Sequence, residues 1–184
     1  REFAEKEIKP VAAELDEKEE FSYETMRKMA DLGLFGMFVP ENYNGQGMDY
    51  ISYIIATEEI ARVDGSHAAT VAAGNSLGIG PIYYFGNEEQ KQEYLPKLCR
   101  GEALWAFGLT EPDAGSNPAA MTTRAVRDRE DWILNGTKMW ITNGSLADVA
   151  IIWAKTGELD DPDSIRGFVV ETERDGYVAT DQRG

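Results

Sequence analysis

The sequence predicts an α+β protein of two domains, an all-α domain over residues 1–103 and an all-β domain over residues 104–184. Apolar residues recur at helical spacing through the first part of the chain. Short aromatic and β-branched runs, separated by turn residues, fill the second part. Helices and strands do not alternate along the sequence, which disfavours a parallel, doubly wound sheet. With 184 residues, the chain is long enough for two small hydrophobic cores.

The predicted helical domain begins with an amphipathic segment. Its apolar residues, from Phe3 to Leu15, fall near one helix face, between Glu and Lys residues that would face water. Ser22 is the predicted N-cap of the next helix, and Gly33 is predicted to end it. Residues 40–47 read PENYNGQG, a composition typical of a loop.

Three more helices are predicted before residue 103. Asp49 is placed to cap a strongly apolar helix that extends to Val63. Residues 68–77 are too apolar on all sides for a surface helix. Asn87 and Gln90 have the spacing of a capping box at the start of the last helix.

The all-β domain is predicted from short strands separated by turn signals. Residues 132–134 and 137–142 flank Asn135-Gly136, which predicts a hairpin closed by a type I′ turn. Further strands are expected at residues 105–110, 122–126, 149–154 and 168–170. Strands of this number and length favour a small barrel, with a sandwich as the alternative.

Charge and composition exclude several classes of function. The chain has 18 Lys and Arg against 33 Asp and Glu, a formal net charge of −15, and nucleic-acid binding needs a basic surface instead. No apolar run reaches the roughly 18 residues of a membrane span. One Cys and one His make an internal disulfide impossible and a structural zinc site unexpected. These features suit a protein of a reducing, intracellular compartment.

The two ends of the sequence suggest a piece of a longer chain. Arg1 opens in the middle of a helical pattern, and residues 177–184 end without a cap or a closing apolar run. No targeting segment is visible at the N-terminus. We therefore expect further functional residues to lie outside the sequence.

One motif matches a hydrolase signature in its letters. Residues 74–78 read GNSLG, the G-x-S-x-G of a nucleophile elbow, which needs a strand before the serine and a histidine after it. The preceding residues have a helical pattern, and the single histidine, His67, comes before Ser76. A serine hydrolase is therefore a distant alternative, and His67 is expected to cap or pack.

Two segments of the second half have the composition of a ligand site. Residues 107–117, FGLTEPDAGSN, offer hydroxyls and backbone N–H groups where a strand leads into a turn. Trp140 and Thr142 are two residues apart, so in a strand they share one face and suit a flat heteroaromatic ligand. A simple Pro-Asp turn and an ordinary core Trp are the alternatives that composition leaves open.

At these residues the sequence resembles the acyl-CoA dehydrogenase family over nearly all of its length. The motifs that carry the resemblance are PENY at 40–43, EEIAR at 58–62, NSL at 75–77, LTEPDAGS at 109–116, LNGTKMWITNG at 134–144 and GFVVE at 167–171. The resemblance implies a helical N-terminal domain and a β middle domain. It also implies a C-terminal four-helix domain, which is missing from this sequence.

The resemblance further implies a reaction and its partners. Members of this family use FAD to oxidise an acyl-CoA at Cα–Cβ: a carboxylate removes the α-proton, and the β-hydrogen leaves as hydride to the flavin. The product is a trans-2-enoyl-CoA, and the electrons pass to an electron-transfer flavoprotein. Members are typically homotetramers, which implies a homotetramer for the full-length protein, in the bacterial cytoplasm or the mitochondrial matrix.

Cofactor and substrate residues follow from the same resemblance, position by position. Residues that correspond to cofactor-binding positions of the family are Phe107, Leu109, Thr110, Gly115, Ser116, Trp140 and Thr142. Residues that correspond to substrate-binding positions are Ser116, which approaches the pantetheine of CoA, and Thr70, Ala73, Gly74 and Leu77, which border the acyl pocket.

Two departures from the family pattern concern charge and catalysis. Asn117 stands where the family usually has Asp. The catalytic carboxylate is a Glu of the C-terminal portion, so no residue of this sequence is expected to be catalytic, and the fragment is expected to be inactive alone. Glu111 belongs to the motif as a structural residue.

Three alternatives to the dehydrogenase remain within or near this fold. An acyl-CoA oxidase would pass electrons to O₂, and a flavin monooxygenase-like relative would form an oxygen adduct, differences that a fold alone does not reveal. A non-catalytic interaction module would keep the fold without flavin. Intact Thr110, Ser116, Trp140 and Thr142 argue against the module.

Overall fold

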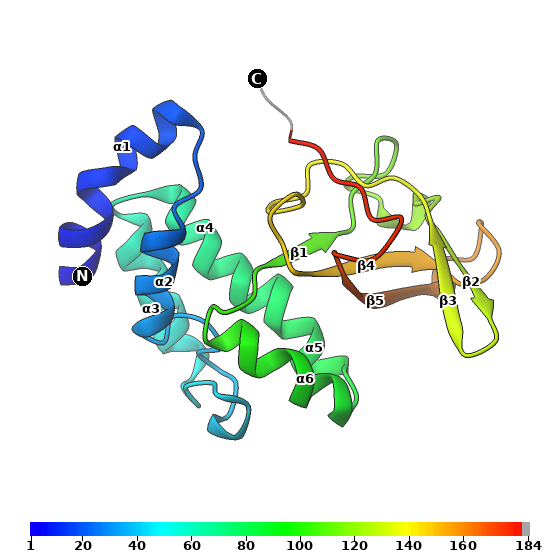
Figure 1. The fold of residues 1–184 in the computed structure, drawn as a ribbon, viewed down its shortest axis with the longest axis horizontal. Helices are drawn as coiled ribbons and strands as arrows, with labels where there is room; N and C mark the ends of the chain where they lie inside the picture. The colour runs from blue at the N-terminus through cyan, green and yellow to red at the C-terminus, as the bar shows by residue number, and fades with distance from the viewer. Residues whose placement is uncertain (182–184) are drawn as a thin grey trace. The chain divides into compact units, whose positions relative to one another are not determined.

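The computed structural model describes residues 1–181 (Figure 1), which form two compact units. The first unit, Arg1–Ala103, is built from helices, and the second, from Leu104 onward, is built around one β-sheet. The predicted order, a helical domain followed by a β domain, is confirmed. Each unit is described below by itself.

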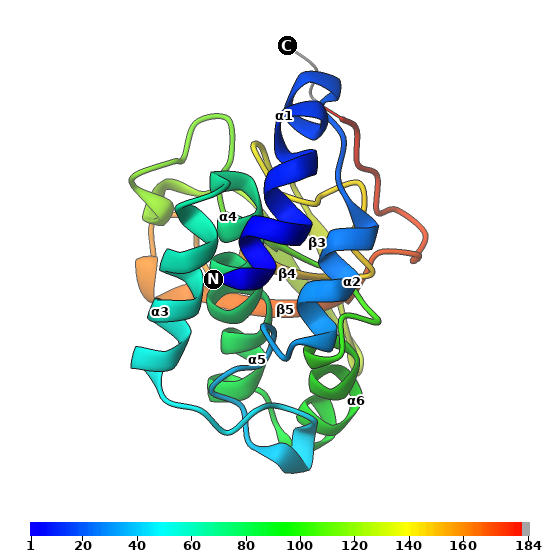
Figure 2. The ribbon, with the colours of Figure 1, turned by 90° about the vertical axis from the view of Figure 1, so that its left-hand side faces the viewer.

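Six α-helices and two π-helical segments form most of the first unit (Figures 1 and 2). Their bounds are Ala4–Ile8 (π), α1 (Lys9–Lys18), α2 (Tyr23–Asp31), α3 (Tyr50–Ala61), α4 (Gly65–Ala73), Gly74–Ile79 (π), α5 (Gly80–Phe85) and α6 (Glu88–Cys99). The predicted loop at residues 40–47 contains only one short 3₁₀ turn, Glu41–Tyr43.

Local capping residues set where these helices begin. The Ser22 hydroxyl accepts a 3.2 Å hydrogen bond from the N–H of Thr25, and the Asp49 carboxylate accepts one of 2.7 Å from Ser52. Asn87 and Gln90 cap each other's backbone N–H groups at 2.8 and 3.0 Å. All three predicted caps are confirmed, because each depends only on residues within one helical turn.

A continuous helix from Gly65 to Phe85 runs through α4, a π-helical segment and α5. Asn75 lies in the π segment and is fully buried. Its side chain accepts a 3.0 Å bond from Met37 N–H and donates to the carbonyls of Leu34 at 2.7 Å and Val71 at 2.9 Å. Asn75 therefore fastens the chain after α2 to this helix.

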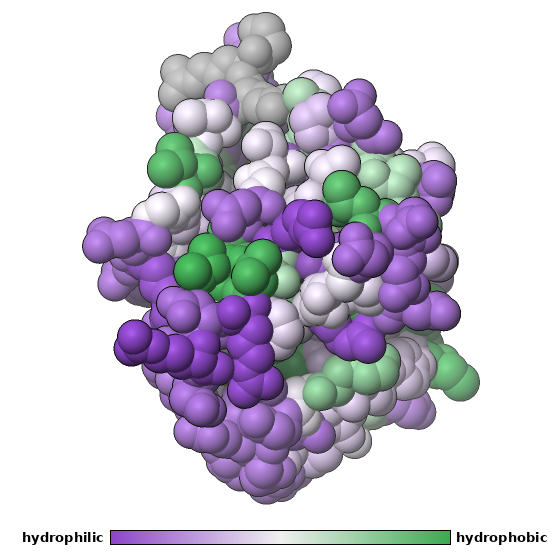
Figure 3. Space-filling model, turned by 90° about the vertical axis from the view of Figure 1, so that its right-hand side faces the viewer, coloured by the Kyte–Doolittle hydropathy of each residue, from purple (hydrophilic) through white to green (hydrophobic). Residues whose placement is uncertain are grey.

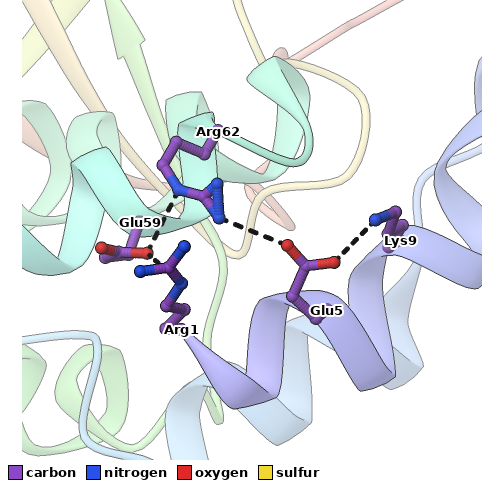
Figure 4. A network of polar contacts seen from close by, with 5 residues as sticks. All are labelled: Arg1, Glu5, Lys9, Glu59 and Arg62. Atoms are coloured by element: carbon purple, nitrogen blue, oxygen red, sulfur yellow. Dashed lines mark hydrogen bonds and ion pairs between the residues drawn. The ribbon is translucent and has the colours of Figure 1, made fainter.

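Charged side chains join the N-terminal helix to α3 on the surface of the first unit (Figure 4). Glu5 pairs with Lys9 at 2.7 Å and with Arg62 at 3.3 Å. Arg62 also contacts Glu59 at 3.4 Å, and Arg1 approaches Glu59 at 4.0 Å. These pairs are largely exposed, so water screens them and each contributes little to stability.

Five strands form the sheet of the second unit: β1 (Trp105–Gly108), β2 (Arg124–Asp128), β3 (Asp131–Asn135), β4 (Val149–Lys155) and β5 (Ile165–Glu171). The strand order is β1-β4-β2-β3, and β5 pairs with β4. β1 runs parallel to β4, whereas β4–β5 and β2–β3 are antiparallel. The structure confirms a β-sheet domain, and closure into a barrel stays a prediction.

The predicted hairpin around Asn135-Gly136 is wrong. β3 pairs with the preceding strand, β2, through a two-residue turn at Arg129-Glu130, and Arg129 takes the left-handed conformation with φ 58°. Asn135 ends β3, and residues 137–142 form no strand. A Cβ on Gly136 would lie 2.2 Å from the Thr123 hydroxyl oxygen, so this glycine serves a close approach rather than a turn.

Small residues let a loop pack on one face of the sheet. Ala106 and Ala150 from neighbouring strands form a buried cluster with Ala147, and Ile141 and Tyr177 pack against it. On the surface, apolar side chains gather in separate patches among polar ones (Figure 3). Val126 on β2 and Ile133 on β3 lie opposite each other, and both side chains are exposed.

Candidate functional site

The two segments with ligand-site composition lie side by side in the second unit. The N–H of Met139 donates a 2.9 Å hydrogen bond to the carbonyl of Thr110, and Lys138 Nζ donates to the carbonyl of Leu109 at 3.1 Å. β1 ends at Gly108, so Leu109 and Thr110 directly follow the strand. Residues 137–142, which include Lys138 and Met139, form a loop and not the predicted strand.

Trp140 is presented by this loop rather than buried under it. Its side chain is 71% exposed, and its backbone has φ 60°, a conformation uncommon for a non-glycine residue. The alternative of an ordinary core Trp is therefore wrong. The prediction that Trp140 shares a strand face with Thr142 is also wrong, because there is no strand here.

The loop is held in place on both sides of Trp140. Lys138 and Met139 fasten its start, as described above, and Ile141 packs on the alanine cluster of the sheet. Beyond these, Asn143 Nδ2 donates to the carbonyl of Trp105 at 3.3 Å, and the Tyr177 hydroxyl donates to the carbonyl of Gly144 at 2.9 Å. An exposed aromatic ring on a fixed loop is arranged in advance for stacking.

The turn at Pro112-Asp113 is closed by reciprocal bonds between Glu111 and Ala114, of 3.0 and 3.2 Å. The Pro-Asp turn is therefore present, and Gly115 and Ser116 follow it on the exposed surface. Among the described residues, no atom beyond the two chain neighbours lies within 4 Å of where a Cβ of Gly115 would be. Within residues 1–181, no group accepts a hydrogen bond from the N–H of Gly115 or Ser116.

Three hydroxyls lie on these two segments: those of Thr110, Ser116 and Thr142. Thr110 is half-buried, and Ser116 and Thr142 are exposed. None of the three hydroxyls has a hydrogen-bonding partner in the part of the chain that the structure describes. Hydroxyl and N–H donors beside an exposed indole can bind a planar polar ring that carries anionic groups.

A buried carboxylate supports the junction of the two segments. Glu111 is 4% exposed and accepts bonds from the N–H groups of Thr122 at 2.7 Å and Thr123 at 3.0 Å, from both of their hydroxyls, and from Lys138 Nζ at 2.8 Å. Burial alone would raise the pKa of Glu111, but the bonds from Lys138 and the two threonines lower the pKa to about 2. Burial outweighs the carboxylate's attraction in Lys138 and lowers the pKa of that ammonium group.

Phe107 is separated from the loop by the sheet. It is half-buried in β1 and makes an edge-to-face contact with Trp153, with ring centroids 5.8 Å apart. A Cβ on the next residue, Gly108, would lie 3.4 Å from Lys138 Cγ. Because successive strand residues face opposite sides, Phe107 lies on the sheet face away from Lys138.

The four predicted acyl-pocket residues belong to the other unit. Thr70 and Leu77 lie two turns apart on the Gly65–Phe85 helix, with Ala73 and Gly74 between them at three- and four-residue spacing from each. Thr70 and Ala73 are half-buried, Gly74 is buried and Leu77 is 37% exposed. The Thr70 hydroxyl bonds back to the carbonyl of Ser66 at 3.1 Å. The helix therefore arranges these four residues along one of its faces.

The nucleophile-elbow geometry is not present at Ser76. The serine lies inside the continuous helix, and its hydroxyl donates to the carbonyl of Ala72 at 2.7 Å. His67 instead contacts Asp64 through Nδ1 at 2.7 Å and the buried Thr25 hydroxyl through Nε2 at 2.8 Å. The single histidine packs as expected and does not activate this serine.

The ionisation of Asp64 fits this packing role. Burial opposes a charge on Asp64, but hydrogen bonds from the backbone N–H and the ring of His67 outweigh burial. The pKa of Asp64 therefore lies below its ordinary value. Asp64 is also the N-cap of α4, which it caps through the N–H of His67 at 2.8 Å.

Sequence reasoning missed Lys138. It lies two residues before Trp140 in the second segment and reaches Glu111 across 27 residues of sequence. The signal available was a lysine within the run KMWIT, but no local pattern links it to Glu111.

Among residues 1–181, no cluster of three His, Cys, Asp or Glu could hold a metal ion. In the same range, no helix is long and apolar enough to cross a membrane.

Comparisons with known proteins point to one family for both units. Residues 1–102 match the family model of the acyl-CoA dehydrogenase N-terminal domain, and residues 106–184 match that of the acyl-CoA dehydrogenase middle domain. A probable acyl-CoA dehydrogenase of Bacillus subtilis is 45% identical over 181 residues, 98% of this chain and 48% of the relative. The human mitochondrial short-chain specific acyl-CoA dehydrogenase is 41% identical over 178 residues, 97% of this chain and 43% of the relative.

A solved structure agrees with the sequence comparisons. The glutaryl-CoA dehydrogenase of Mycobacterium smegmatis, in complex with FADH2, superposes with a TM-score of 0.92 at 44% identity. The match covers 99% of this chain and 46% of that chain. The chain thus spans about half the length of the relatives it matches.

Proposed function

The chain belongs to the acyl-CoA dehydrogenase family, and on that premise we propose that the full-length protein is an FAD-dependent acyl-CoA dehydrogenase. It removes hydrogen from Cα and Cβ of an acyl-CoA thioester and forms the trans-2-enoyl-CoA. Electron-transfer flavoprotein accepts the electrons. The bacterial and mitochondrial relatives support a bacterial cytoplasm or a mitochondrial matrix as its compartment.

One observation carries the proposal: the exposed Trp140 ring stands on a fixed loop that is hydrogen-bonded to the Leu109–Thr110 segment. A flavin ring is planar, apolar over its faces and polar at its edges, so it needs an aromatic surface and donors beside it. Within residues 1–181, the hydroxyls of Thr110 and Thr142 have no hydrogen-bonding partner, which fits donors for such a ring. The relative solved with FADH2 supports the same cofactor.

Four residues of the chain then have a proposed task toward FAD. Trp140 packs on the isoalloxazine, Leu109 and Thr110 meet its pyrimidine side, and Thr142 donates near N5. Bound FAD supplies the two-electron acceptor. Oriented donors near the ring stabilise the negative charge that arises on it when it is reduced.

Phe107 stays a proposed cofactor residue, and its place on the opposite sheet face restricts it to a supporting contact. The open N–H groups of Gly115 and Ser116 suit the pyrophosphate, and Ser116 also suits the pantetheine of CoA.

Substrate binding is divided between residues of the two units. Thr70, Ala73, Gly74 and Leu77 border the acyl group in this proposal, and Ala73 and Gly74 are small residues that would leave the acyl pocket open there. The α-proton is removed by a Glu outside these 184 residues, so no residue of this chain is proposed as the base. We propose a homotetramer for the full-length protein, as the family resemblance implies.

An anaerobic absorption experiment on the full-length protein tests this function. Acyl-CoAs of different chain type are added one at a time, and the visible flavin band is followed. Bleaching by one chain type is expected, and it would also name the substrate class. A bound flavin that no acyl-CoA bleaches, but that reacts with O₂ once reduced, would favour the oxygen-using relatives. A protein that binds no FAD would be the non-catalytic module.

A further inference from the structure

We propose that Glu111 and Lys138 are a positioning pair that sets where the Trp140 loop stands against the end of β1. The inference rests on the proposed flavin site and assigns it two residues that do not themselves have to touch the ring. Lys138 Nζ bridges the two sides: it donates to Glu111 Oε1 at 2.8 Å and to the Leu109 carbonyl at 3.1 Å. The neighbouring Met139 N–H bonds to Thr110 at 2.9 Å.

The Glu111 carboxylate is itself held in place by residues other than Lys138. Thr122 and Thr123 bind both oxygens of Glu111 through two N–H groups and two hydroxyls. With these four donors and Lys138, the carboxylate has little freedom to move. Lys138 therefore meets a rigid anion, and the loop that carries it takes up one position.

Two glycines make room for this arrangement. A Cβ on Gly108 would lie 2.7 Å from Ile152 Cδ1 and 3.4 Å from Lys138 Cγ, so the lysine stem crosses β1 where a side chain is absent. A Cβ on Gly136 would lie 2.2 Å from the Thr123 hydroxyl oxygen, so the chain leading to Lys138 passes closely over Thr123. Both close approaches allow the Trp140 loop to lie next to the Glu111 carboxylate.

A buried ion pair is weak evidence for stability, because well-packed apolar groups often replace one without loss. Its clearer use is to specify one arrangement over others. Here the arrangement it specifies places Trp140 and Thr142 relative to Leu109 and Thr110, which lie 30 to 33 positions earlier in the sequence. The pair thus acts on the flavin through the loop.

Three variants of the full-length protein test the inference: Glu111→Gln, Lys138→Met and the double variant. Met keeps the apolar stem over Gly108 but removes the charge. Each single variant leaves one buried group without its partner, so we expect it to lower the melting temperature. The double variant removes both charges, so we expect its melting temperature to recover toward that of the unmodified protein.

Two readouts separate positioning from a merely structural role. In the double variant, we expect the Met139 amide of the FAD-free protein to exchange with solvent hydrogen at least about tenfold faster, because its segment is no longer fixed. We also expect the Kd for FAD to rise roughly tenfold, as when supporting contacts behind a ligand site are removed. Glu102→Gln, which breaks an exposed pair with Arg100 at 2.6 Å, is the matched control and should change neither readout.

The outcomes are distinguishable. A double variant that folds but shows an unchanged hydrogen-exchange rate of the Met139 amide, or an unchanged Kd for FAD, would overturn the inference. If the unmodified full-length protein binds no FAD, the proposed function fails, and the pair is then judged on Met139 exchange alone.

Discussion

The backbone N–H of Met139 donates a 2.9 Å hydrogen bond to the carbonyl of Thr110, 29 residues earlier in the chain. This bond joins the end of strand β1 to the loop that exposes Trp140. The two segments form one surface, and a ligand that stacks on the indole would lie beside the Thr110 segment. The predictions below test that surface and the fold that supports it.

Replacing Trp140 by Ala should weaken flavin binding without loss of folding stability. Aromatic stacking on a planar heterocycle contributes about 1–3 kcal/mol, so the Kd for FAD should rise roughly 5- to 150-fold. The side chain is exposed, so the free energy of unfolding should change by less than about 0.5 kcal/mol. Flavin fluorescence titration and urea unfolding measure the two. Phe85→Ala, at an 84% exposed aromatic residue of the first unit, should change neither.

Of two glycine substitutions, one should weaken FAD binding and the other should lower the stability of the fold. Gly115→Ala places its methyl group where no atom of the described residues, apart from its chain neighbours, lies within 4 Å, so the protein should fold normally and bind FAD more weakly. Gly136→Ala forces a contact of 2.2 Å with Thr123 and should lower the melting temperature by several degrees. Thermal unfolding and FAD titration of both variants check this pair of results. Normal FAD affinity in Gly115→Ala would remove the pyrophosphate from that turn.

The Glu111 carboxylate predicts a specific loss of stability in acid. Its pKa in the folded protein, about 2, lies below the ordinary value of 4.5, so its ionised form stabilises the fold above pH 4.5. That stabilisation, on the order of 3 kcal/mol, should disappear as the pH falls from about 4.5 to about 2. Urea unfolding across this range measures it. Glu111→Gln should show a flatter pH dependence there, and an unchanged slope would contradict the assignment.

Asn75→Ala should destabilise the first unit. The substitution leaves Met37 N–H and the Leu34 carbonyl buried without a partner, at a cost of roughly 1–3 kcal/mol for each group. Ser76→Ala, one residue later and exposed, loses a bond to its own helix and an interaction with the Tyr53 side chain, and should cost much less than Asn75→Ala. Urea unfolding compares them. Equal stability of the two variants would show that Asn75 does not hold the chain after α2.

Sequence patterns predicted the local features of the fold well. Ser22, Asp49 and Asn87 are confirmed as N-caps, because a cap depends on residues in the next turn. The β4 and β5 strands were also expected, since their β-branched runs bury side chains in the sheet. In each case the deciding interactions lie close by in the chain.

Features that depend on distant residues were not predictable in the same way. Asn135-Gly136 has the composition of a hairpin turn, but packing against Thr123 decides its conformation. The TKMWIT run has strand propensity, but a buried carboxylate 27 residues away fixes Lys138 and leaves the run as a loop. The candidate residues were therefore predictable from motifs, whereas the support behind them was visible only in the structure.

A crystal structure of the full-length protein with FAD tests the central claim most directly. We predict that the isoalloxazine ring lies in van der Waals contact with the Trp140 indole and within hydrogen-bonding distance of the Thr110 and Thr142 hydroxyls. A flavin bound elsewhere, with Trp140 exposed to solvent, would contradict the account.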